Sequence, residues 1–254
     1  VFIRVDANKT IGSGHLLRML VLADEFKVKE CNVSFILKDL AESLKGNLVY
    51  PFQVFSKGDS ELSILKILEK QSYPGDVYIT DSEEEELYQA EFGAYVQSSS
   101  LTWLQLSFRS DFYCFADYLH NQNIRAKALK YKISSNTQLM LGLDYVILKQ
   151  QYLNLQASLK TFKAKESNWL FFFGGADLDN RTIFFLDTLL TSDIQYKKIS
   201  IIIGGMYPFE DELRTKIENL NHLNILLYKN TPLMPELMAD AKFAVTSGGL
   251  TLWE

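Results

Sequence analysis

Short apolar segments, each followed by a polar or glycine-bearing turn and then by helically spaced leucines, constrain the fold of this chain most strongly. Val1–Val5 is the first such segment, and it leads into the turn Asp6–Gly14. The next stretch, His15–Lys29, has its apolar residues at helical spacing, and Val33–Leu37 follows as a second buried strand. A strand, loop, helix and strand in this order predict a parallel sheet, because parallel neighbours need a crossover connection.

The same alternation continues along the whole chain. In the first half, strands are predicted at Phe52–Phe55, Val77–Thr80 and Leu101–Leu106, with a helix at Ser60–Lys70. In the second half, strands are predicted at Trp169–Phe173, Ile199–Ile203, Leu223–Leu227 and Phe243–Thr246, with helices near Asn180–Leu190, Pro208–Leu220 and Pro232–Ala239. We therefore expect an α/β protein of two domains, residues 1–150 and 168–254, joined by the polar linker 151–167, which is expected to contain some helix.

Composition excludes several classes of partner. The 26 Lys and Arg residues against 31 Asp and Glu residues leave a net charge of −5. Binding to phosphate backbones or anionic lipid relies on clustered excess cations, so we do not expect nucleic acid as a partner. Every apolar run is shorter than the about 18 residues that a membrane span requires.

The ends of the chain and its cysteines bear on its location and completeness. Cys31 and Cys114 form no Cys-x-x-Cys pair, and Val1–Arg4 has no signal-peptide layout, so a cytoplasmic protein is predicted. Because the chain starts without Met and stops abruptly at Glu254, we expect the complete product to be longer. The sequence indicates no oligomeric state.

The first glycine loop, Gly12-Ser13-Gly14, places His15 in the first turn of a predicted helix. It lacks the third glycine of a dinucleotide fingerprint, so it is a weak signal for nicotinamide. The amides of a helix N-terminus attract negative charge, and ligands of open α/β folds bind at this edge of the sheet. The same helix end favours the neutral imidazole, so His15, with Arg18 nearby, is a candidate general base. A capping or packing role for His15 is the alternative, and His120 and His222 are predicted to pack or to lie on the surface.

Two further glycine loops occur in the second half, Gly174-Gly175-Ala176-Asp177 and Ser247-Gly248-Gly249-Leu250-Thr251. Each follows an apolar strand and precedes a predicted helix, so together they can hold a diphosphate through main-chain amides and helix dipoles without a metal. Tight turns without a ligand are the alternative. Glu254, about one turn into its helix, is suited to a ribose diol.

Other catalytic patterns are missing from the sequence. No His-x-x-x-His, Gly-x-Ser-x-Gly or Walker lysine motif occurs, which disfavours zinc hydrolysis, serine acyl transfer and P-loop chemistry. The acidic run Glu83–Glu86 is predicted to be a solvated helix start rather than a metal cluster.

Several motifs resemble one family. The opening Arg4-x-Asp6-x-x-x-x-Ile11-Gly12-x-Gly14-His15-x-x-Arg18 resembles that of the UDP-2,4-diacetamido-2,4,6-trideoxy-β-L-altropyranose hydrolases of pseudaminic acid synthesis and of the related spore-coat polysaccharide proteins. The resemblance continues at Asn121-Gln122-Asn123, Leu141-Gly142-x-x-Tyr145-x-x-Leu148, Phe173-Gly174-Gly175-Ala176-Asp177, Met238-x-x-Ala241 and Ser247-Gly248-Gly249-Leu250-Thr251-Leu252-Trp253-Glu254. The matches cover nearly the whole chain in order, and the first and last are the most specific.

This resemblance implies a glycosyltransferase-B-like fold, in which two Rossmann-like domains face each other across a cleft. In that family the C-terminal half holds UDP, and water replaces the bond from the anomeric carbon to the diphosphate with inversion. The resemblance implies a UDP-sugar substrate, no cofactor and no metal, with His15 as the catalytic residue. It assigns substrate binding to Asp6, Gly12, Gly14, Arg18, Asp81, Asn121 and Tyr145. It assigns UDP binding to Gly174, Gly175, Ala176, Ser247, Gly248, Gly249, Thr251 and Glu254.

The chain also departs from the family pattern. Asp81-Ser82-Glu83 has a glutamate where relatives carry a tyrosine, and Leu106-Ser107 replaces an acidic pair. Lys149 and Lys242 stand where relatives prefer arginine and aspartate. Three hypotheses follow: hydrolysis of a UDP-sugar, binding of a nucleotide-sugar without catalysis, and glycosyl transfer to an acceptor. The fold alone does not separate transfer from hydrolysis.

Overall fold

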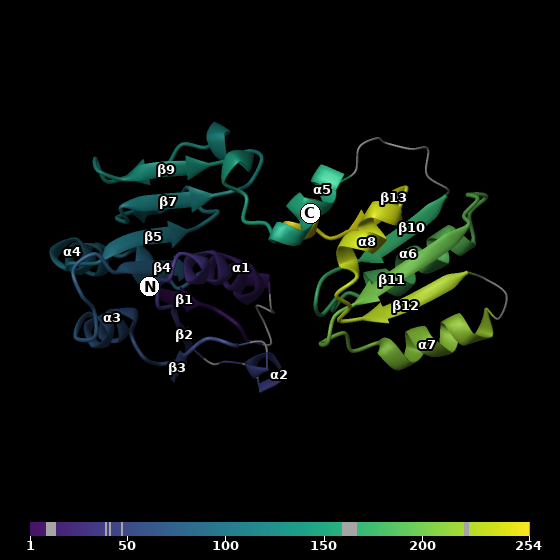
Figure 1. Cartoon of the computed structure of the whole chain (residues 1–254), viewed down its shortest axis with the longest axis horizontal. Coiled ribbons are helices and arrows are strands. Elements are labelled where there is room, and N and C mark those ends of the chain that lie inside the picture. The colour runs from purple at the N-terminus through teal and green to yellow at the C-terminus, as the bar shows by residue number, and fades with distance from the viewer. Residues whose placement is uncertain are drawn as a thin grey trace. The chain divides into compact units, whose positions relative to one another are not determined.

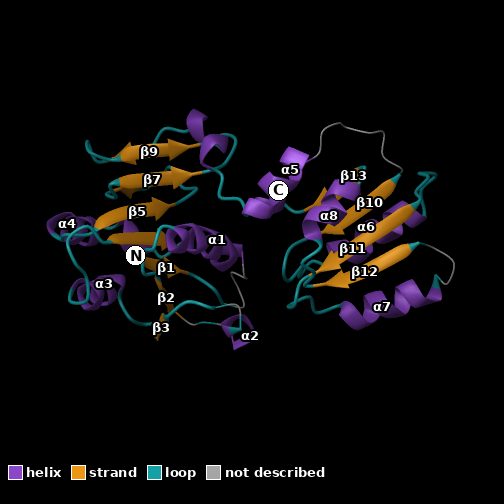
Figure 2. Cartoon of the chain, viewed as in Figure 1, coloured by secondary structure: helices purple, strands orange, loops and turns teal. Residues whose placement is uncertain are grey.

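The computed structural model describes residues 1–8, 14–38, 40, 42–46, 48–158, 167–220 and 224–253. The chain divides into two compact units, Val1–Ile147 (unit 1) and Leu148–Glu254 (unit 2) (Figure 1). Both units consist of parallel strands with helices between them (Figure 2), so the predicted α/β class with two Rossmann-like halves is confirmed.

Unit 1 is built on a seven-stranded parallel sheet with the strand order β3-β2-β1-β4-β5-β7-β9. These strands are β1 (Phe2–Val5), β2 (Ser34–Lys38), β3 (Phe52–Phe55), β4 (Val77–Asp81), β5 (Thr102–Leu106), β7 (Tyr118–Asn121) and β9 (Gln138–Leu141). The central strands β1, β2 and β4 are almost entirely buried, which explains why they are mostly apolar. Arg4 of β1 is also buried, and it is paired with Asp6 and Glu61. In the edge strand β3, exposed and half-buried side chains alternate. In the edge strand β9, the first two side chains are exposed and the last two are half-buried.

The helices of unit 1 connect these strands. They are α1 (Gly14–Val28), α2 (Glu42–Lys45), α3 (Glu61–Glu69) and α4 (Ala90–Ser98), with the 3-10 turns η1 (Glu85–Tyr88), η2 (Ala126–Ala128) and η3 (Leu143–Tyr145). Two short strands, β6 (Tyr113–Cys114) and β8 (Lys132–Ile133), form a small separate parallel sheet. Helix α3 begins where predicted, because Ser60 caps it by accepting a hydrogen bond from the Ser63 amide at 3.1 Å. Such a cap contributes about 1 kcal/mol.

A short helix begins in the acidic run, as predicted, but one of its carboxylates has a further role. The carboxylate of Glu86 accepts hydrogen bonds from the amides of Glu61 and Leu62 at 2.6 and 2.9 Å. It therefore caps the N-terminus of α3, a helix more than twenty residues earlier in the chain. Glu85 begins η1, a 3-10 turn rather than an α-helix.

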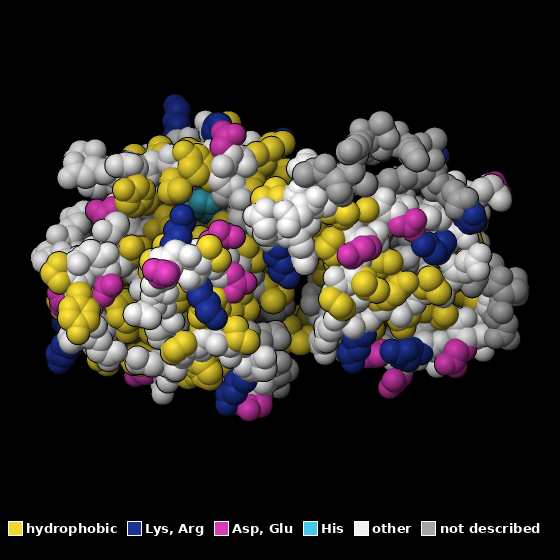
Figure 3. Space-filling view, in the orientation of Figure 1, with side chains coloured by type: hydrophobic (Ala, Val, Ile, Leu, Met, Phe, Trp, Pro, Cys, Tyr) yellow, Lys and Arg dark blue, Asp and Glu magenta, His cyan; other side chains and the backbone are white. Residues whose placement is uncertain are grey.

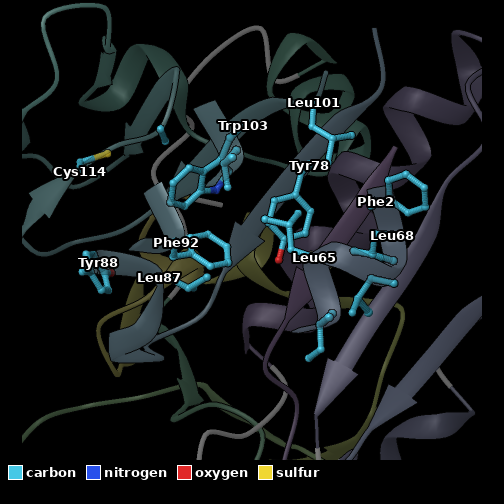
Figure 4. Packing of buried hydrophobic residues seen from close by; sticks show 14 of the residues in the cluster. Phe2, Leu65, Leu68, Tyr78, Leu87, Tyr88, Phe92, Leu101, Trp103 and Cys114 are labelled. Atoms are coloured by element: carbon cyan, nitrogen blue, oxygen red, sulfur yellow. The ribbon is translucent and has the colours of Figure 1, made fainter. Parts of the chain in front are cut away.

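The core of unit 1 fixes the end of β4. Trp103, Tyr78 and Phe92 are fully or almost fully buried in a cluster that also takes side chains from α3 and α4 (Figure 4). The rings of Phe92 and Trp103 meet edge to face, with their centroids 5.2 Å apart. The indole Nε1 of Trp103 donates a hydrogen bond to Thr80 Oγ1 at 3.0 Å, which anchors β4 immediately before Asp81.

Unit 2 contains a four-stranded parallel sheet with the order β12-β11-β10-β13. Its strands are β10 (Asn168–Phe172), β11 (Lys198–Ile203), β12 (Ile225–Lys229) and β13 (Phe243–Thr246), and its helices are α5 (Gln150–Ser158), α6 (Arg181–Leu190), α7 (Glu210–Asn219), α8 (Met234–Asp240) and the 3-10 turn η4 (Leu250–Leu252). Successive residues of β10 face opposite sides, because Phe171 packs with the α6 and α7 side chains and Leu170 packs with Leu237 of α8.

Several elements differ from the sequence expectation. Strands β7 and β9 and helix α4 were not predicted. Some helix was expected in the linker 151–167, and part of that stretch forms α5, which contacts α8 of unit 2. Among the described residues, no helix is long and apolar enough to cross a bilayer. On the face shown in Figure 3, the described lysine and arginine side chains are interspersed with carboxylates and do not form one continuous basic surface.

Candidate active site

The strand order of unit 1 creates a switch point between β1 and β4. From β1 the chain continues to β2 on one side, whereas β4 is followed by β5 on the other side. Ligands of open α/β sheets bind outside the carboxyl ends of the strands at such a point. Asp81 is the last residue of β4 and pairs with Val5 of β1, so its side chain stands at this edge.

Three side chains converge at the switch point. The Nδ1 atom of His15 lies 2.7 Å from Oδ1 of Asp81. Arg18 donates from Nε to Oδ2 of Asp81 at 2.5 Å, and its terminal NH2 group donates to Oδ1. His15 and Arg18 are three residues apart on α1, so they share one helix face and both reach the same carboxylate.

The ionised state of Asp81 determines what His15 can do. Burial alone would raise the pKa of Asp81, but the hydrogen bonds from His15 and Arg18 and the guanidinium charge outweigh it, so the pKa lies below its ordinary value. An ionised carboxylate accepts hydrogen bonds, so the imidazole donates its Nδ1 hydrogen to Asp81 and leaves Nε2 as the nitrogen that can take a proton. The Asp81 side chain is 1% exposed and that of His15 is 21% exposed, so only the imidazole is open to a reactant.

Asp81 and Arg18 are bonded to each other as well as lying close to His15. Both oxygens of Asp81 accept hydrogen bonds from His15 and Arg18, so the carboxylate is placed to orient the imidazole, and its predicted contact with a substrate stays a prediction. The guanidinium of Arg18 is likewise engaged with Asp81, and its carbon lies 5.0 Å from the centroid of the Phe108 ring. The structure brings His15, Arg18 and Asp81 together as one cluster.

The other predicted residues of the first turn are Asp6, Gly12 and Gly14. Asp6 is buried, with Oδ1 accepting from Arg4 at 2.7 Å and Oδ2 accepting from the Glu83 amide at 3.3 Å. These bonds give Asp6 a structural role in joining the turns after β1 and β4. Gly14 is the first residue of α1, and a side chain built on it would meet open space. Gly12 lies outside the described residues.

Asn121 is held by protein groups at both ends of its side-chain amide. Its side chain is fully buried, with Nδ2 donating to the Tyr131 hydroxyl at 2.9 Å and Oδ1 accepting from the Asn123 amide at 3.1 Å. Both ends of the amide thus hold the loop after β7, and the expected contact of Asn121 with a substrate stays a prediction. The Tyr145 side chain is exposed, and its carbonyl lies 2.6 Å from Nε2 of His120.

His120 lies near the carboxyl edge of the unit 1 sheet, a position that the sequence did not indicate. It is buried at the end of β7, next to β5, and the Tyr145 carbonyl requires its Nε2 to donate. Burial lowers the pKa of His120, so it is neutral, and it lies within the electrostatic range of Arg18 and Asp81. The missing signal was the strand itself, because β7 was not predicted and His120 could not be placed at its end. His222 lies outside the described residues.

A cavity of about 400 Å³ opens beside Asp6. It is lined by Asp6, Asn8, Lys38, Lys57 and the acidic run Glu83–Glu86. Lys38 is itself buried, with Nζ 3.4 Å from Glu61 and 3.3 Å from Glu84. Because carboxylates outnumber lysines in this lining, the cavity disfavours a diphosphate. Glu83, which replaces the tyrosine of the family pattern, is exposed here.

Unit 2 has a second switch point, between β10 and β13. The chain leaves β10 for β11 on one side, and β13 lies on the other side. Phe172 pairs with Thr246, so the loops that start at Gly174 and Ser247 emerge next to each other. A Cβ built on Gly174 would lie 3.8 Å from the Ser247 hydroxyl. The two predicted UDP motifs are therefore adjacent within one unit.

Close packing explains why glycine occupies this edge. Gly174 has a φ of +89°, a conformation that other residues rarely adopt. A Cβ built on Gly204, after β11, would lie 2.4 Å from the Cα of Gly175. The Gly175 carbonyl also accepts a hydrogen bond from the Met206 amide at 3.2 Å. The loop after β11 thus packs directly against the first predicted UDP motif, and a side chain at Gly204 would have no room.

The helix ends near these loops differ from the prediction. The carboxylate of Asp177 accepts hydrogen bonds from the amides of Arg181 and Thr182 at 3.0 and 2.9 Å. Asp177 therefore caps α6 and occupies two amides at the N-terminus of that helix. After Gly248 and Gly249 the described chain forms only η4, which contains Thr251, in place of the predicted α-helix. Glu254 lies outside the described residues.

Comparisons with known proteins place these features in context. The chain is 30% identical over 263 residues to an uncharacterised protein of Methanocaldococcus jannaschii, an alignment that covers 100% of this chain and 53% of the relative. It is 25% identical over 256 residues to the UDP-2,4-diacetamido-2,4,6-trideoxy-beta-L-altropyranose hydrolase of Campylobacter jejuni, covering 97% of this chain and 84% of the relative. The chain thus spans about half of the archaeal protein and most of the bacterial one. No family model matches the chain.

Among solved structures, the crystal structure of the Anabaena protein HepE in complex with UDP and glucose is similar, with a TM-score of 0.50 and 14% sequence identity. The match covers 96% of this chain and 73% of HepE. At this level of identity the comparison shows a shared fold, and it agrees with the two parallel-sheet units described above.

Proposed function

We propose that the protein is a UDP-sugar hydrolase acting on a UDP-activated diacetamido-trideoxy hexose. Residues 1–150 would act on the sugar, and residues 168–254 would hold the nucleotide. The observation that carries this proposal is the 2.7 Å hydrogen bond between His15 and Asp81 at the switch point of unit 1. A buried carboxylate that fixes the imidazole and leaves Nε2 available is an arrangement suited to general-base catalysis. The similarity to the Campylobacter jejuni hydrolase supports the choice of substrate class.

In the proposed reaction, Nε2 of His15 takes a proton from a water molecule while the water oxygen bonds to the anomeric carbon. The bond from that carbon to the diphosphate oxygen breaks, and its electron pair leaves with UDP. Asp81 stabilises the imidazolium that forms, and Arg18 holds the carboxylate in place. Base catalysis of this kind contributes about 10²–10⁴ in rate.

The leaving group requires stabilisation of a developing negative charge. We assign this to main-chain amides of the loops at Gly174–Ala176 and Ser247–Gly249, which lie side by side at the second switch point. Fixed amide dipoles stabilise such charge effectively, because they need no reorganisation during the reaction. The acidic cavity beside Asp6 supports this division, since its net negative lining disfavours the diphosphate.

Nucleotide-sugar binding without turnover is the second candidate. It is favoured by Glu83, which stands in place of the family's tyrosine, and by Asp6, whose carboxylate is fully engaged by Arg4 and the Glu83 amide. This candidate predicts that UDP raises the melting temperature while no UDP-sugar is consumed.

A UDP-release assay separates the candidates. Wild type and His15→Ala are incubated with a panel of UDP-diacetamido sugars, without any acceptor. We expect release of UDP by the wild type and a fall of at least about a hundredfold in kcat for the variant, since the base is lost. UDP affinity, measured by calorimetry, should be unchanged. Equal turnover by the two proteins would remove His15 from the mechanism, and no turnover with intact UDP binding would favour the second candidate.

A further inference from the structure

An exposed aromatic ring lies beside the His15 cluster. Phe108 follows β5 by two residues and is 37% exposed. The guanidinium carbon of Arg18 lies over this ring, 5.0 Å from its centroid. The same guanidinium is hydrogen-bonded to Asp81 and lies 3.2 Å from Nδ1 of His15. The ring is thus part of the same cluster as the imidazole, although ninety residues separate it from Arg18 in the sequence.

The backbone on both sides of Phe108 is held in place. The Ser107 amide donates to the His120 carbonyl at 3.1 Å, and the Ser107 hydroxyl is hydrogen-bonded to Tyr88 at 2.8 Å and accepts from the Arg109 amide at 3.1 Å. The Arg109 guanidinium covers the neighbouring ring of Phe112, 3.6 Å from its centroid. Phe108 is therefore an aromatic side chain on a fixed loop, with its surface left partly open.

We propose that Phe108 determines sugar specificity by packing against the apolar face and methyl groups of a deoxy, N-acetylated hexose. This inference rests on the proposed function and adds a residue that selects the sugar. The hexose in question carries a C6 methyl group and two acetamido methyl groups, and aromatic rings bind such groups by area burial and by C–H contacts with the π face. Polar groups of a fully hydroxylated sugar would gain less from the same ring.

A purely structural role for Phe108 makes a different prediction. If the ring only supports Arg18 through a cation–π contact, its removal disturbs the His15 cluster equally for every substrate. If the ring contacts the sugar, its removal selectively weakens the binding of methyl-rich UDP-sugars and does not change the affinity for free UDP. The ratio of affinities between ligands therefore separates the two roles, whereas a change in stability or in kcat does not.

The test measures affinities for UDP, UDP-glucose and a UDP-diacetamido-trideoxy hexose, together with initial rates, in wild type, Phe108→Ala and Phe108→Tyr. Phe52→Ala is the matched control, because Phe52 is 40% exposed in the same unit, on the edge strand β3. We expect Phe108→Ala to weaken binding of the diacetamido sugar about tenfold, which corresponds to the loss of one aromatic packing contact. The affinity of Phe108→Ala for UDP alone should stay close to that of wild type. Phe108→Tyr and the control Phe52→Ala should bind all three ligands about as well as wild type does.

Each outcome decides the inference. An unchanged ratio between the diacetamido sugar and UDP in Phe108→Ala, or an equal loss for all three ligands, overturns it. If the wild type releases UDP but this ratio of affinities is unchanged in Phe108→Ala, the proposed hydrolase function is supported and the role of Phe108 in sugar specificity is refuted. A selective loss of affinity in a protein that releases no UDP supports Phe108 and refutes hydrolysis. Failure of the wild type to bind any UDP-sugar refutes both.

Discussion

Replacing Asp81 by asparagine tests whether the carboxylate acts through His15. In the wild type both oxygens of Asp81 accept hydrogen bonds, one from Nδ1 of His15 at 2.7 Å and both from Arg18. Asparagine keeps one accepting oxygen and adds an NH2 donor. That donor favours the opposite imidazole tautomer, in which Nε2 carries the hydrogen and accepts no proton from water.

The magnitude follows from these contacts. A carboxylate that fixes the tautomer of a catalytic histidine contributes up to about 10⁴-fold, so we expect kcat to fall by about 10²–10⁴ with UDP affinity unchanged. The stability should also fall, because the buried guanidinium of Arg18 loses its counter-charge. Complete removal of such a partner costs about 3–5 kcal/mol, and the hydrogen bonds that asparagine retains reduce the expected cost to about 1–3 kcal/mol.

The assay is UDP release under saturating substrate, with thermal unfolding to confirm that the variant is folded. Asp24→Asn is the matched control, since Asp24 lies on α1 and accepts a hydrogen bond from the Tyr50 hydroxyl at 2.5 Å. A double variant with His15→Ala should be scarcely slower than His15→Ala alone, because residues that act as one unit are not additive. Folded Asp81→Asn with a kcat within about threefold of wild type would refute the reasoning, as would fully multiplicative losses.

Two more predictions concern acid stability and the nucleotide loops. Because the pKa of Asp81 is lower in the folded protein, ionised Asp81 stabilises the fold. This stabilisation is fully present above the ordinary aspartate pKa of about 4, and it is lost as the pH falls through the lower folded pKa. In urea unfolding between pH 6 and 3, the free energy of unfolding should therefore fall more steeply for wild type than for Asp81→Asn. The same pH dependence of the free energy of unfolding in both proteins would contradict this prediction. Gly204→Ala places a Cβ 2.4 Å from the Gly175 backbone and should weaken UDP binding at least about tenfold by calorimetry, whereas Gly58→Ala, where a Cβ meets nothing within 4 Å, should not. Unchanged UDP affinity in folded Gly204→Ala would show that the Gly174–Ala176 loop is not the nucleotide site.

The buried central strands could be predicted from the sequence because both faces of each strand are covered. Residues such as Ile3 and Ile36 are fully buried, so these strands appear as mostly apolar segments, although the buried Arg4 interrupts the first of them. Strand β9 lacks this signal, since Gln138 and Leu139 are exposed and the strand lies at the edge of the sheet. Strand β7 ends in His120 and Asn121, whose polarity conceals a strand that is buried over most of its length.

The candidate site could be predicted only in part for a related reason. His15 and Arg18 were identifiable because they are three residues apart on one helix. The partnership of His15 with Asp81 depends on β4 pairing with β1, although β2 and β3 lie between them in the sequence. For Asn121, a motif match does not reveal that the side chain is fully buried. The contact of Phe108 with Arg18 likewise exists only once the strand order is known.

The central claim, that water attacks the anomeric carbon with His15 as the base, is tested most directly by running the UDP-release reaction in ¹⁸O-labelled water without an acceptor. Mass spectrometry of the released UDP then reports which bond was broken. We predict UDP free of ¹⁸O, formed by the wild type and at least about a hundredfold more slowly by His15→Ala. UDP that carries ¹⁸O would place the attack at phosphorus, and it would contradict the mechanism.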